Sequence, residues 1–214
     1  MNLNPESLRI GCLISGGGRT VLNLHEAIER GEVPASIEVV LAHRADLPGV
    51  ERCRAAGLEV MVLPLTAGGD RDELSDRIDD ALESRRVELI CLAGYLKYFR
   101  VSPKWCDRVI NIHPSLLPRH GGRGMYGNHV HAAVIAAGES ESGCTVHAVD
   151  EIYDHGAVVL QRRCPVHPQD TADALADRVF REECLALPHA IAAIAREDVK
   201  IVDGKVVGPA RGEC

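Results

Sequence analysis

The sequence predicts an α/β fold: a Rossmann-like open sheet with a parallel N-terminal half, a mixed C-terminal half and helices on both faces. Short apolar runs alternate with longer segments of helical period through residue 93, which indicates βαβ units and a parallel sheet. Beyond residue 109 the alternation changes, because two strand-like runs, 145–149 and 157–164, have few residues between them. The second half of the sheet is therefore expected to be mixed.

The expected elements follow the chain in order. Strands are predicted at residues 8–14, 37–42, 60–63, 89–93, 109–112, 145–149 and 157–164, and helices at 21–28 and 50–56. Gly57 directly follows the second helix and is a typical helix end.

A third helix is expected after residue 70. Leu74, Ile78 and Leu82 recur at the spacing of one helix face. Asp70 with Glu73 three residues later has the pattern of a capping box, so the helix should begin there.

Residues 171–195 form the longest helical candidate, with Thr171 as its N-cap. The residues expected on one face are Leu175, Val179 and Leu185. Pro188 is expected to kink or divide this helix. Residues 200–207 resemble a small hairpin around Asp203-Gly204.

Composition limits the function classes. A chain of 214 residues is long enough for one well-buried α/β domain, and a net charge of −7 argues against a general nucleic-acid binder. Eight scattered cysteines without a Cys-x-x-Cys pair fit reduced thiols. No apolar run approaches a membrane span and the N-terminus lacks a signal-peptide core, so we expect a soluble cytoplasmic protein without a membrane or nucleic-acid partner.

A glycine-rich turn lies between the first strand and the first helix. The segment Ser15-Gly16-Gly17-Gly18-Arg19-Thr20 offers backbone N–H groups at a helix start, where a phosphate is favoured. Val21 replaces the third glycine of a dinucleotide loop and no acid closes the second strand, so a single phosphate is favoured over NAD, while Arg44 leaves NADP open. A merely tight turn is the alternative.

Asn111 and His113 are two apart on a predicted strand, so their side chains should share one side. Pro114 ends that strand, at the edge where open α/β sheets usually bind ligands. An Asn amide can donate to an oxyanion, a His can move a proton, and a nearby Asp can hold the imidazole. Spacing alone allows Asp150 or Asp154, and a buried pair without a catalytic role is the alternative.

Other polar residues carry weaker signals. Arg71 at a helix start indicates an anion nearby, although a solvated arginine explains it equally well. Histidines occur at positions 120, 129, 131, 147 and 155, but no HExxH or Cys-rich spacing accompanies them, so we expect no metal. Ser115 lacks a nucleophile-elbow setting and is interpreted as structural.

From about residue 8 to 194 the chain resembles the folate-dependent formyltransferase family, in particular the phosphoribosylglycinamide (GAR) formyltransferases. The motifs that carry the resemblance are Leu13-Ile-Ser-Gly-Gly-Gly18, Leu92-Ala-Gly-Tyr-Leu96, Asn111-Ile-His-Pro-Ser-Leu-Leu-Pro118, and Cys144-Thr-Val-His147 with Asp154-x-Gly156. The third is highly specific for folate-linked formyl transfer, whereas the glycine loop alone is weak evidence.

The resemblance implies a role for each matching residue. The implied catalytic residues are Asn111, His113 and Asp154; the implied phosphate ligands are Gly16, Gly17, Gly18, Arg19, Thr20 and Arg71; Glu183 is implied to hold the ribose. The implied folate-binding residues are Leu92, Tyr95, Leu96, Lys97, Tyr98, Phe99, Val149 and Asp150. The bond between Leu117 and Pro118 is implied to be cis.

The resemblance further implies one formyltransferase domain over residues 1–214, with a phosphate-binding half at about 8–110 and a catalytic and folate-binding half at about 89–195. The implied reaction takes the formyl group of the co-substrate 10-formyltetrahydrofolate to the amine of GAR in purine synthesis, in a monomer or homodimer. The sequence departs from the family's pattern at two places that bear on the identity of the amine substrate. Arg19-Thr20 replaces the commoner Ser-Asn of the phosphate loop, and the loop 120–127 is longer than the commoner loop of the family.

Several related activities are alternatives. A sugar-amine formyltransferase fits the same motifs, whereas a formyltetrahydrofolate hydrolase or a tRNA formyltransferase normally carries an extra domain that we do not expect within 214 residues. An NADP-dependent oxidoreductase using the glycine loop and Arg44 is an alternative from a different class, and a non-catalytic binding module is another.

Overall fold

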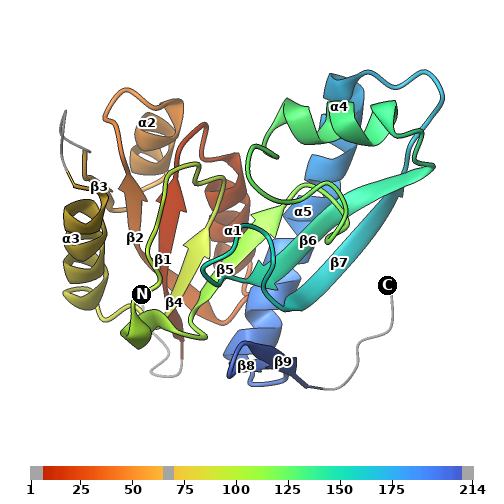
Figure 1. The fold of residues 1–214 in the computed structure, drawn as a ribbon. Helices are drawn as coiled ribbons and strands as arrows, with labels where there is room; N and C mark the ends of the chain where they lie inside the picture. The colour runs from red at the N-terminus through yellow and green to blue at the C-terminus, as the bar shows by residue number, and fades with distance from the viewer. Residues whose placement is uncertain (1–6, 65–69, 209–214) are drawn as a thin grey trace. The chain divides into compact units, whose positions relative to one another are not determined.

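The α/β alternation expected from the sequence is present in the computed structural model, which describes residues 7–64 and 70–208 (Figure 1). The chain divides into two units, Met1–Val109 and Ile110–Cys214. Their boundary coincides with the expected end of the phosphate-binding half near residue 110. That the whole chain is one domain stays a prediction.

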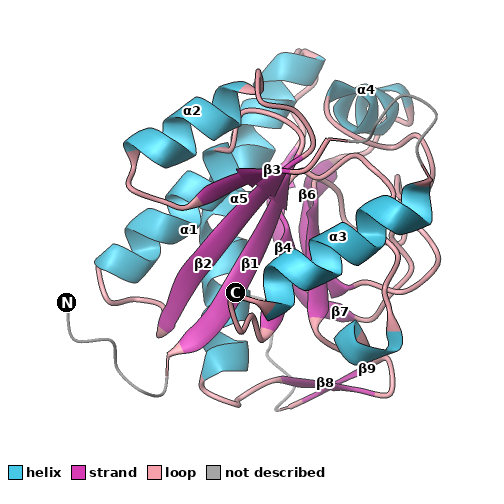
Figure 2. Cartoon of the chain, turned by 90° about the vertical axis from the view of Figure 1, so that its left-hand side faces the viewer, coloured by secondary structure: helices cyan, strands magenta, loops and turns pink. Residues whose placement is uncertain are grey.

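The N-terminal unit is a parallel sheet in the order β3-β2-β1-β4. Its strands are β1 (Leu8–Ile14), β2 (Ala35–Ala42), β3 (Val60–Val62) and β4 (Leu89–Leu92), and its helices are α1 (Arg19–Glu29), α2 (Pro48–Ala55), α3 (Arg71–Glu83) and the short 3₁₀ helix η1 (Pro103–Trp105). Strands β1, β2 and β3 are added toward one edge of the sheet, and the next strand, β4, is added on the other side of β1. Right-handed crossovers therefore put α1 and α2 on one face and α3 on the other, as Figure 2 shows.

Sequence features explain how α3 packs on this sheet. The Asp70 side chain accepts a hydrogen bond from the Asp72 backbone N–H, so the expected helix start is confirmed. Leu82 is fully buried, and a Cβ atom added to Gly11 of β1 would lie 2.3 Å from its Cδ2 atom. A glycine in β1 thus lets the helix approach the strand closely.

The C-terminal unit contains an antiparallel run of strands in the order β5-β6-β7. Its elements are β5 (Val109–His113, whose first residue belongs to the other unit), α4 (Asn128–Ala136), β6 (Glu141–Ala148), β7 (Val158–Pro165), α5 (Ala172–Ala195), β8 (Lys200–Val202) and β9 (Lys205–Val207). Parallel strands in the first half and antiparallel strands in the second confirm the predicted α/β fold.

The two faces of the antiparallel strands differ in polarity. One face carries the buried Cys144 and Val146 of β6. Burial raises the pKa of the Cys144 thiol, and the charges of acidic residues on α5 add to the rise, so this face is turned toward α5. The other face carries Asn111, His113 and His147. Because α5 packs against β6 and β7 on the first face, the second face is the one that α5 leaves uncovered.

The end of α5 differs from the sequence prediction. The helix runs without a break through Pro188, so a division there is wrong, while a kink stays a prediction. Leu187, Pro188 and Ile191 are all buried, and this packing compensates for the hydrogen bond that proline removes. Leu185 is 45% exposed rather than on the buried face. It lies six residues after Val179, which rotates it away from the core.

Other elements extend or confirm the prediction. Helix α4 was not predicted, and β6 begins at Glu141 rather than at residue 145. The hairpin of β8 and β9 is confirmed, with Asp203 at φ 50° and Gly204 at φ 70° in its two-residue turn. Within residues 7–64 and 70–208, no helix has both the length and the apolar character needed to cross a bilayer.

We expect Thr171→Ala to destabilise the C-terminal unit. The Thr171 side chain accepts a hydrogen bond from the Ala174 N–H at 3.2 Å, and loss of such a cap costs about 1 kcal/mol of unfolding free energy. Denaturant unfolding measures the change, with Thr171→Ser as the control that keeps the hydroxyl. Equal stability of the Ala variant and the native chain would contradict this assignment.

Candidate active site

Strand β5 brings the amide of Asn111 and the imidazole of His113 to the polar face of the C-terminal unit. In the antiparallel register Asn111 lies opposite His147 and His113 lies opposite Thr145. His113 is 3% exposed and His147 is 2% exposed, so both rings are held among protein groups. The shared side predicted for Asn111 and His113 is confirmed.

Backbone carbonyls determine which ring nitrogens carry hydrogen. The Nε2 atom of His113 is 3.0 Å from the His120 carbonyl oxygen, which can only accept, so Nε2 donates. The Nδ1 atom of His113 then lies 3.5 Å from the Asp154 Oδ1 atom. Proton exchange by His113 is therefore confined to Nδ1, the nitrogen beside the carboxylate.

His147 is arranged in the same way and orients Asn111. Its Nδ1 atom donates to the Ala148 carbonyl at 2.7 Å, and its Nε2 atom is 3.1 Å from Nδ2 of Asn111 and 3.7 Å from Oδ1 of Asp154. In the neutral ring Nε2 accepts from the Asn111 amide. The second N–H of that amide then remains available to a ligand.

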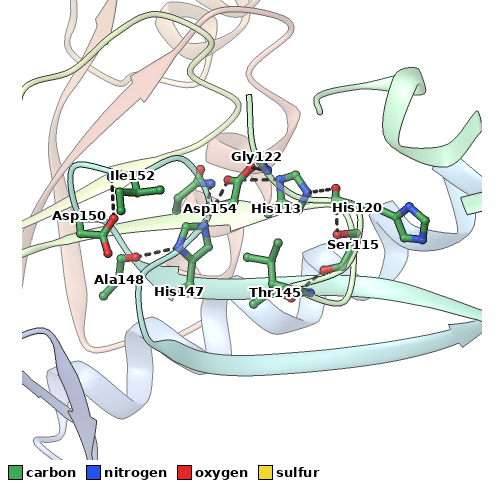
Figure 3. Close-up of polar contacts among 12 residues, drawn as sticks. His113, Ser115, His120, Gly122, Thr145, His147, Ala148, Asp150, Ile152 and Asp154 are labelled. Atoms are coloured by element: carbon green, nitrogen blue, oxygen red, sulfur yellow. Dashed lines mark hydrogen bonds and ion pairs between the residues drawn. The ribbon is translucent and has the colours of Figure 1, made fainter. Parts of the chain in front are cut away.

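Asp154 is held in place by the loop that follows β5. Its Oδ2 atom accepts a hydrogen bond from the Gly122 N–H at 2.8 Å. A Cβ atom on Gly121 would lie 3.2 Å from the Asp154 Cβ and 2.4 Å from the Leu117 Cδ2, so a larger residue there would have to displace both side chains. The carboxylate thus joins the two imidazoles and the loop (Figure 3).

The structure distinguishes the two aspartates that spacing left open. Asp150 turns away from the imidazoles of the strand, since its Oδ2 atom is 2.8 Å from Nδ1 of His155 and its Oδ1 atom accepts from the Ile152 N–H. Asp154 is the carboxylate beside His113 and His147 (Figure 3). The structure therefore brings together Asn111, His113 and Asp154.

Burial and charge act in opposite directions on this cluster. Burial lowers the pKa of His113 below its ordinary value of 6.5, and the Asp154 charge and the His120 carbonyl counteract this only in part. Burial raises the pKa of Asp154, but the nearby His147 and His113 rings and the hydrogen bond from the Gly122 N–H outweigh it, so this pKa is lowered. The carboxylate is ionised and the His113 ring is neutral at pH 7.

A second network fixes the turn after His113. Thr145 Oγ1 donates to the Ser115 carbonyl at 2.6 Å and accepts from the Leu117 N–H at 3.1 Å, while Gln161 donates to the Leu117 carbonyl at 2.9 Å. The Leu117–Pro118 bond is cis, as the resemblance implied. Ser115 Oγ donates to the Arg119 carbonyl, which agrees with a structural role.

The glycine loop of the N-terminal unit is backed by α2. The Gly49 N–H donates to the Gly16 carbonyl at 3.1 Å, and Arg52 Nη1 donates to the Gly17 carbonyl at 3.3 Å. Gly18, at φ 69°, caps α1 without a side-chain hydrogen bond. Two loop carbonyls are thus occupied, and the N-cap residue Gly18 has no side chain to compete with an anion at the start of α1.

The other implied ligands are in several places. Arg71 is the exposed first residue of α3, Arg19 is exposed, and Thr20 is half-buried. Glu183 is half-buried on α5. Burial raises the pKa of Cys144, on the face opposite the triad, and the charge of Glu183 adds to the rise.

The implied folate segment after β4 is tied to the glycine loop. Ser15 Oγ accepts from the Leu96 N–H at 2.9 Å, and the Ser15 N–H donates to the Gly94 carbonyl at 3.1 Å. Leu92 is buried; Tyr95 and Phe99 are half-buried; Leu96, Lys97 and Tyr98 are exposed. Burial raises the pKa of Tyr95 to about 12. In the C-terminal unit Val149 is half-buried and Asp150 exposed.

Sequence reasoning missed the parts of the site that depend on strand pairing and loop packing. The sequence assigned His147 no role of its own beyond a place in a family motif. Strand pairing puts it opposite Asn111, and its ring lies beside Asp154. Gly121 and Gly122 gave no signal beyond being glycines. Among the residues that the structure describes, no group of His, Cys, Asp or Glu is arranged to hold a metal ion, and the absence of a metal stays a prediction.

Comparisons with known proteins agree on one family. A family model described as formyl transferase matches residues 8–191. The chain is 36% identical over 199 residues to a chloroplastic phosphoribosylglycinamide formyltransferase of Arabidopsis thaliana, which covers 92% of this chain and 68% of that protein. It is 33% identical over 207 residues to phosphoribosylglycinamide formyltransferase of Haemophilus influenzae, with 93% and 95% covered.

A solved structure is similar over nearly the whole length. Glycinamide ribonucleotide transformylase 1 from Symbiobacterium toebii superimposes with a TM-score of 0.87 at 33% identity, covering 95% of this chain and 94% of that one. The chain spans 62% to 68% of the length of the plant relatives that it matches.

We expect the His113 imidazole to titrate below pH 6.5 in the native chain and lower still in Asp154→Asn, because the carboxylate favours the protonated ring. Since the folded ring binds a proton less readily than the unfolded one, the stability that His113 contributes is present above pH 6.5 and is lost as the pH falls. NMR titration of the ring gives the pKa. An upward shift in Asp154→Asn would contradict the argument.

Proposed function

The chain belongs to the formyl transferase family, and from this premise we propose that it transfers the formyl group of 10-formyltetrahydrofolate to the primary amine of glycinamide ribonucleotide in de novo purine biosynthesis. The observation that carries the proposal is the meeting of Asn111, His113 and Asp154 on one polar face. Relatives named for this activity match most of the chain and support it. An NADP-dependent oxidoreductase has no comparable support.

The proposed reaction is a direct attack without an acylated enzyme. The nitrogen of the acceptor amine forms a bond to the formyl carbon, and the carbonyl electrons move to the oxygen, giving a tetrahedral oxyanion. The free N–H of the Asn111 amide donates to that oxygen, because the other N–H is directed at His147. Collapse breaks the bond from the formyl carbon to N10 of the folate.

The proposed role of His113 is to move the proton. In the neutral ring Nε2 is committed to the His120 carbonyl, so Nδ1 accepts the proton that the attacking amine loses. The carboxylate of Asp154 beside Nδ1 stabilises the imidazolium that forms. The proton then passes to N10 as the tetrahydrofolate leaves, so that the ring returns to its neutral form.

A mechanism in which His113 begins as a cation and donates to the oxyanion fits less well. Burial lowers the pKa of the ring, and its one N–H in the neutral form is already donated to a carbonyl. A proton acceptor that becomes charged during the reaction fits these contacts better.

The substrates are proposed to bind through the remaining segments. The glycine loop 16–20 and Arg71 take the phosphate, and Glu183 takes the ribose. Folate is proposed to contact the two segments already described, 92–99 and 149–150, of which Leu96 is 56% exposed and Tyr98 43%. We propose a cytoplasmic enzyme that acts as a monomer or homodimer and needs no metal.

We expect Asn111→Ala to lower kcat by two to three powers of ten, since the loss of one oxyanion donor costs about 3 kcal/mol. His113→Ala should have a loss of similar size, because the other ring nitrogen beside Asp154, Nε2 of His147, is occupied by the Asn111 amide. Steady-state release of tetrahydrofolate measures the rate, with His189→Ala on the exposed side of α5 as the control. Near-normal turnover of Asn111→Ala would refute the oxyanion role.

A panel of acceptors tests the substrate. We expect glycinamide ribonucleotide to be formylated with a higher kcat/KM than glycinamide riboside, an amino sugar phosphate or water, because the loop 16–20 is suited to a phosphate and the triad to an amine. Mass spectrometry of the products identifies each formylated amine. If the amino sugar were formylated preferentially, or if the formyl donor were hydrolysed to formate, GAR would not be the acceptor.

A further inference from the structure

The carboxylate of Glu139 holds two consecutive residues of the loop after β5. Glu139 follows α4, and its backbone N–H donates to the Val134 carbonyl at 3.3 Å. One oxygen accepts from Arg119 Nη1 at 2.7 Å, and the other is 3.2 Å from Nε2 of His120. The exposed fractions are 22% for the Glu139 side chain and 17% for that of His120, so this contact is screened less than a surface ion pair.

The same two residues supply the carbonyl groups that face the site. The His120 carbonyl accepts from Nε2 of His113 at 3.0 Å, and the Arg119 carbonyl accepts from Ser115 Oγ at 2.7 Å (Figure 3 shows the first of these). Their side chains are thus tied to Glu139 while their main chain is tied to the segment that carries His113. Each peptide is fixed from both ends.

We propose that Glu139 is a positioning residue for His113: it clamps the turn 119–120 so that the His120 carbonyl keeps Nε2 of the catalytic ring protonated and Nδ1 directed at Asp154. The proposal rests on the proposed function, since it assigns Glu139 a part in the proton transfer by His113. Glu139 acts through His120 and touches neither substrate nor reacting atoms.

The turn needs such an anchor because its own conformation is unfavourable. His120 has φ 55°, in the left-handed region that a non-glycine residue adopts at some cost. Two glycines follow it, and Gly122 has φ 97°. Without Glu139, the His120 carbonyl is held by its hydrogen bonds from His113 and, at 3.4 Å, from Ser115 Oγ against this backbone strain, and a displaced carbonyl would no longer select the tautomer of His113.

The groups that face His113 set the direction of the expected pH change. These are Asp154, His147, the His120 carbonyl, and His131 of α4, whose own pKa is lowered by burial and by His113. The carbonyl favours the protonated ring, so its loss should move the apparent pKa of His113 further down. The acidic limb of the kcat/KM profile should then move to lower pH.

Glu139→Ala tests the clamp, with Glu139→Gln as the conservative variant that keeps one acceptor oxygen. We expect kcat to fall by roughly ten- to a hundredfold in Glu139→Ala, as for a catalytic group displaced by about 1 Å, with less loss in Glu139→Gln and little change in either KM. Glu141→Gln is the matched control, because this exposed acid on β6 pairs with Arg163 away from the loop.

A substrate-free measurement separates this proposal from the proposed function. The ¹⁵N shifts of His113 should report the Nε2–H tautomer in the native chain and a mixture in Glu139→Ala, with circular dichroism confirming that both are folded. An unchanged tautomer and acidic limb in Glu139→Ala would overturn the clamp. If Glu139→Ala does not fold, Glu139→Gln decides by the same two readouts. If the native chain does not formylate GAR while the tautomer still changes, the proposed function fails and the clamp survives as a structural device.

Discussion

The site depends on a single carboxylate that is held between two buried imidazoles. Asp154 lies 3.5 Å from Nδ1 of His113 and 3.7 Å from Nε2 of His147, and the Gly122 N–H binds its other oxygen. Burial opposes the charge of Asp154, yet these partners together keep its pKa low. A protonated Asp154 would donate a hydrogen bond to one of these ring nitrogens. The ionised carboxylate only accepts, so it leaves the ring nitrogen of His113 able to take up a proton.

Strand register is what brings these groups together from two distant segments. The pairing of β5 with β6 puts Asn111 opposite His147, and a shift of one residue would turn every side chain of one strand to the face that α5 covers. The apolar side of the same strands prevents such a shift, because Ile112 and Val146 would then meet the polar face. Core packing thus fixes the catalytic geometry.

The sequence predicted what period and turn chemistry determine, and missed what tertiary packing determines. Alternation along β5 was enough to put Asn111 and His113 on one side. It could not choose between Asp150 and Asp154, because the loop from 149 to 156 folds back and directs Asp150 toward His155. Helix α4 was missed since it follows four glycines within residues 121–127, and a hydrophobic pattern of nine residues gives little signal there.

The lowered pKa of His113 is consistent with a catalytic ring. In the neutral form the Nδ1 lone pair faces Asp154. Burial disfavours the charged form of the ring, which is why it lowers the pKa. Once Nδ1 takes a proton, both ring N–H groups have acceptors already in place, the Asp154 carboxylate and the His120 carbonyl. The surroundings of His113 are thus complementary to the charged ring that exists during the reaction, while burial keeps that charge from forming before it. If His113 were a cation in the resting enzyme, its burial would oppose its function, because burial away from water disfavours the charged ring.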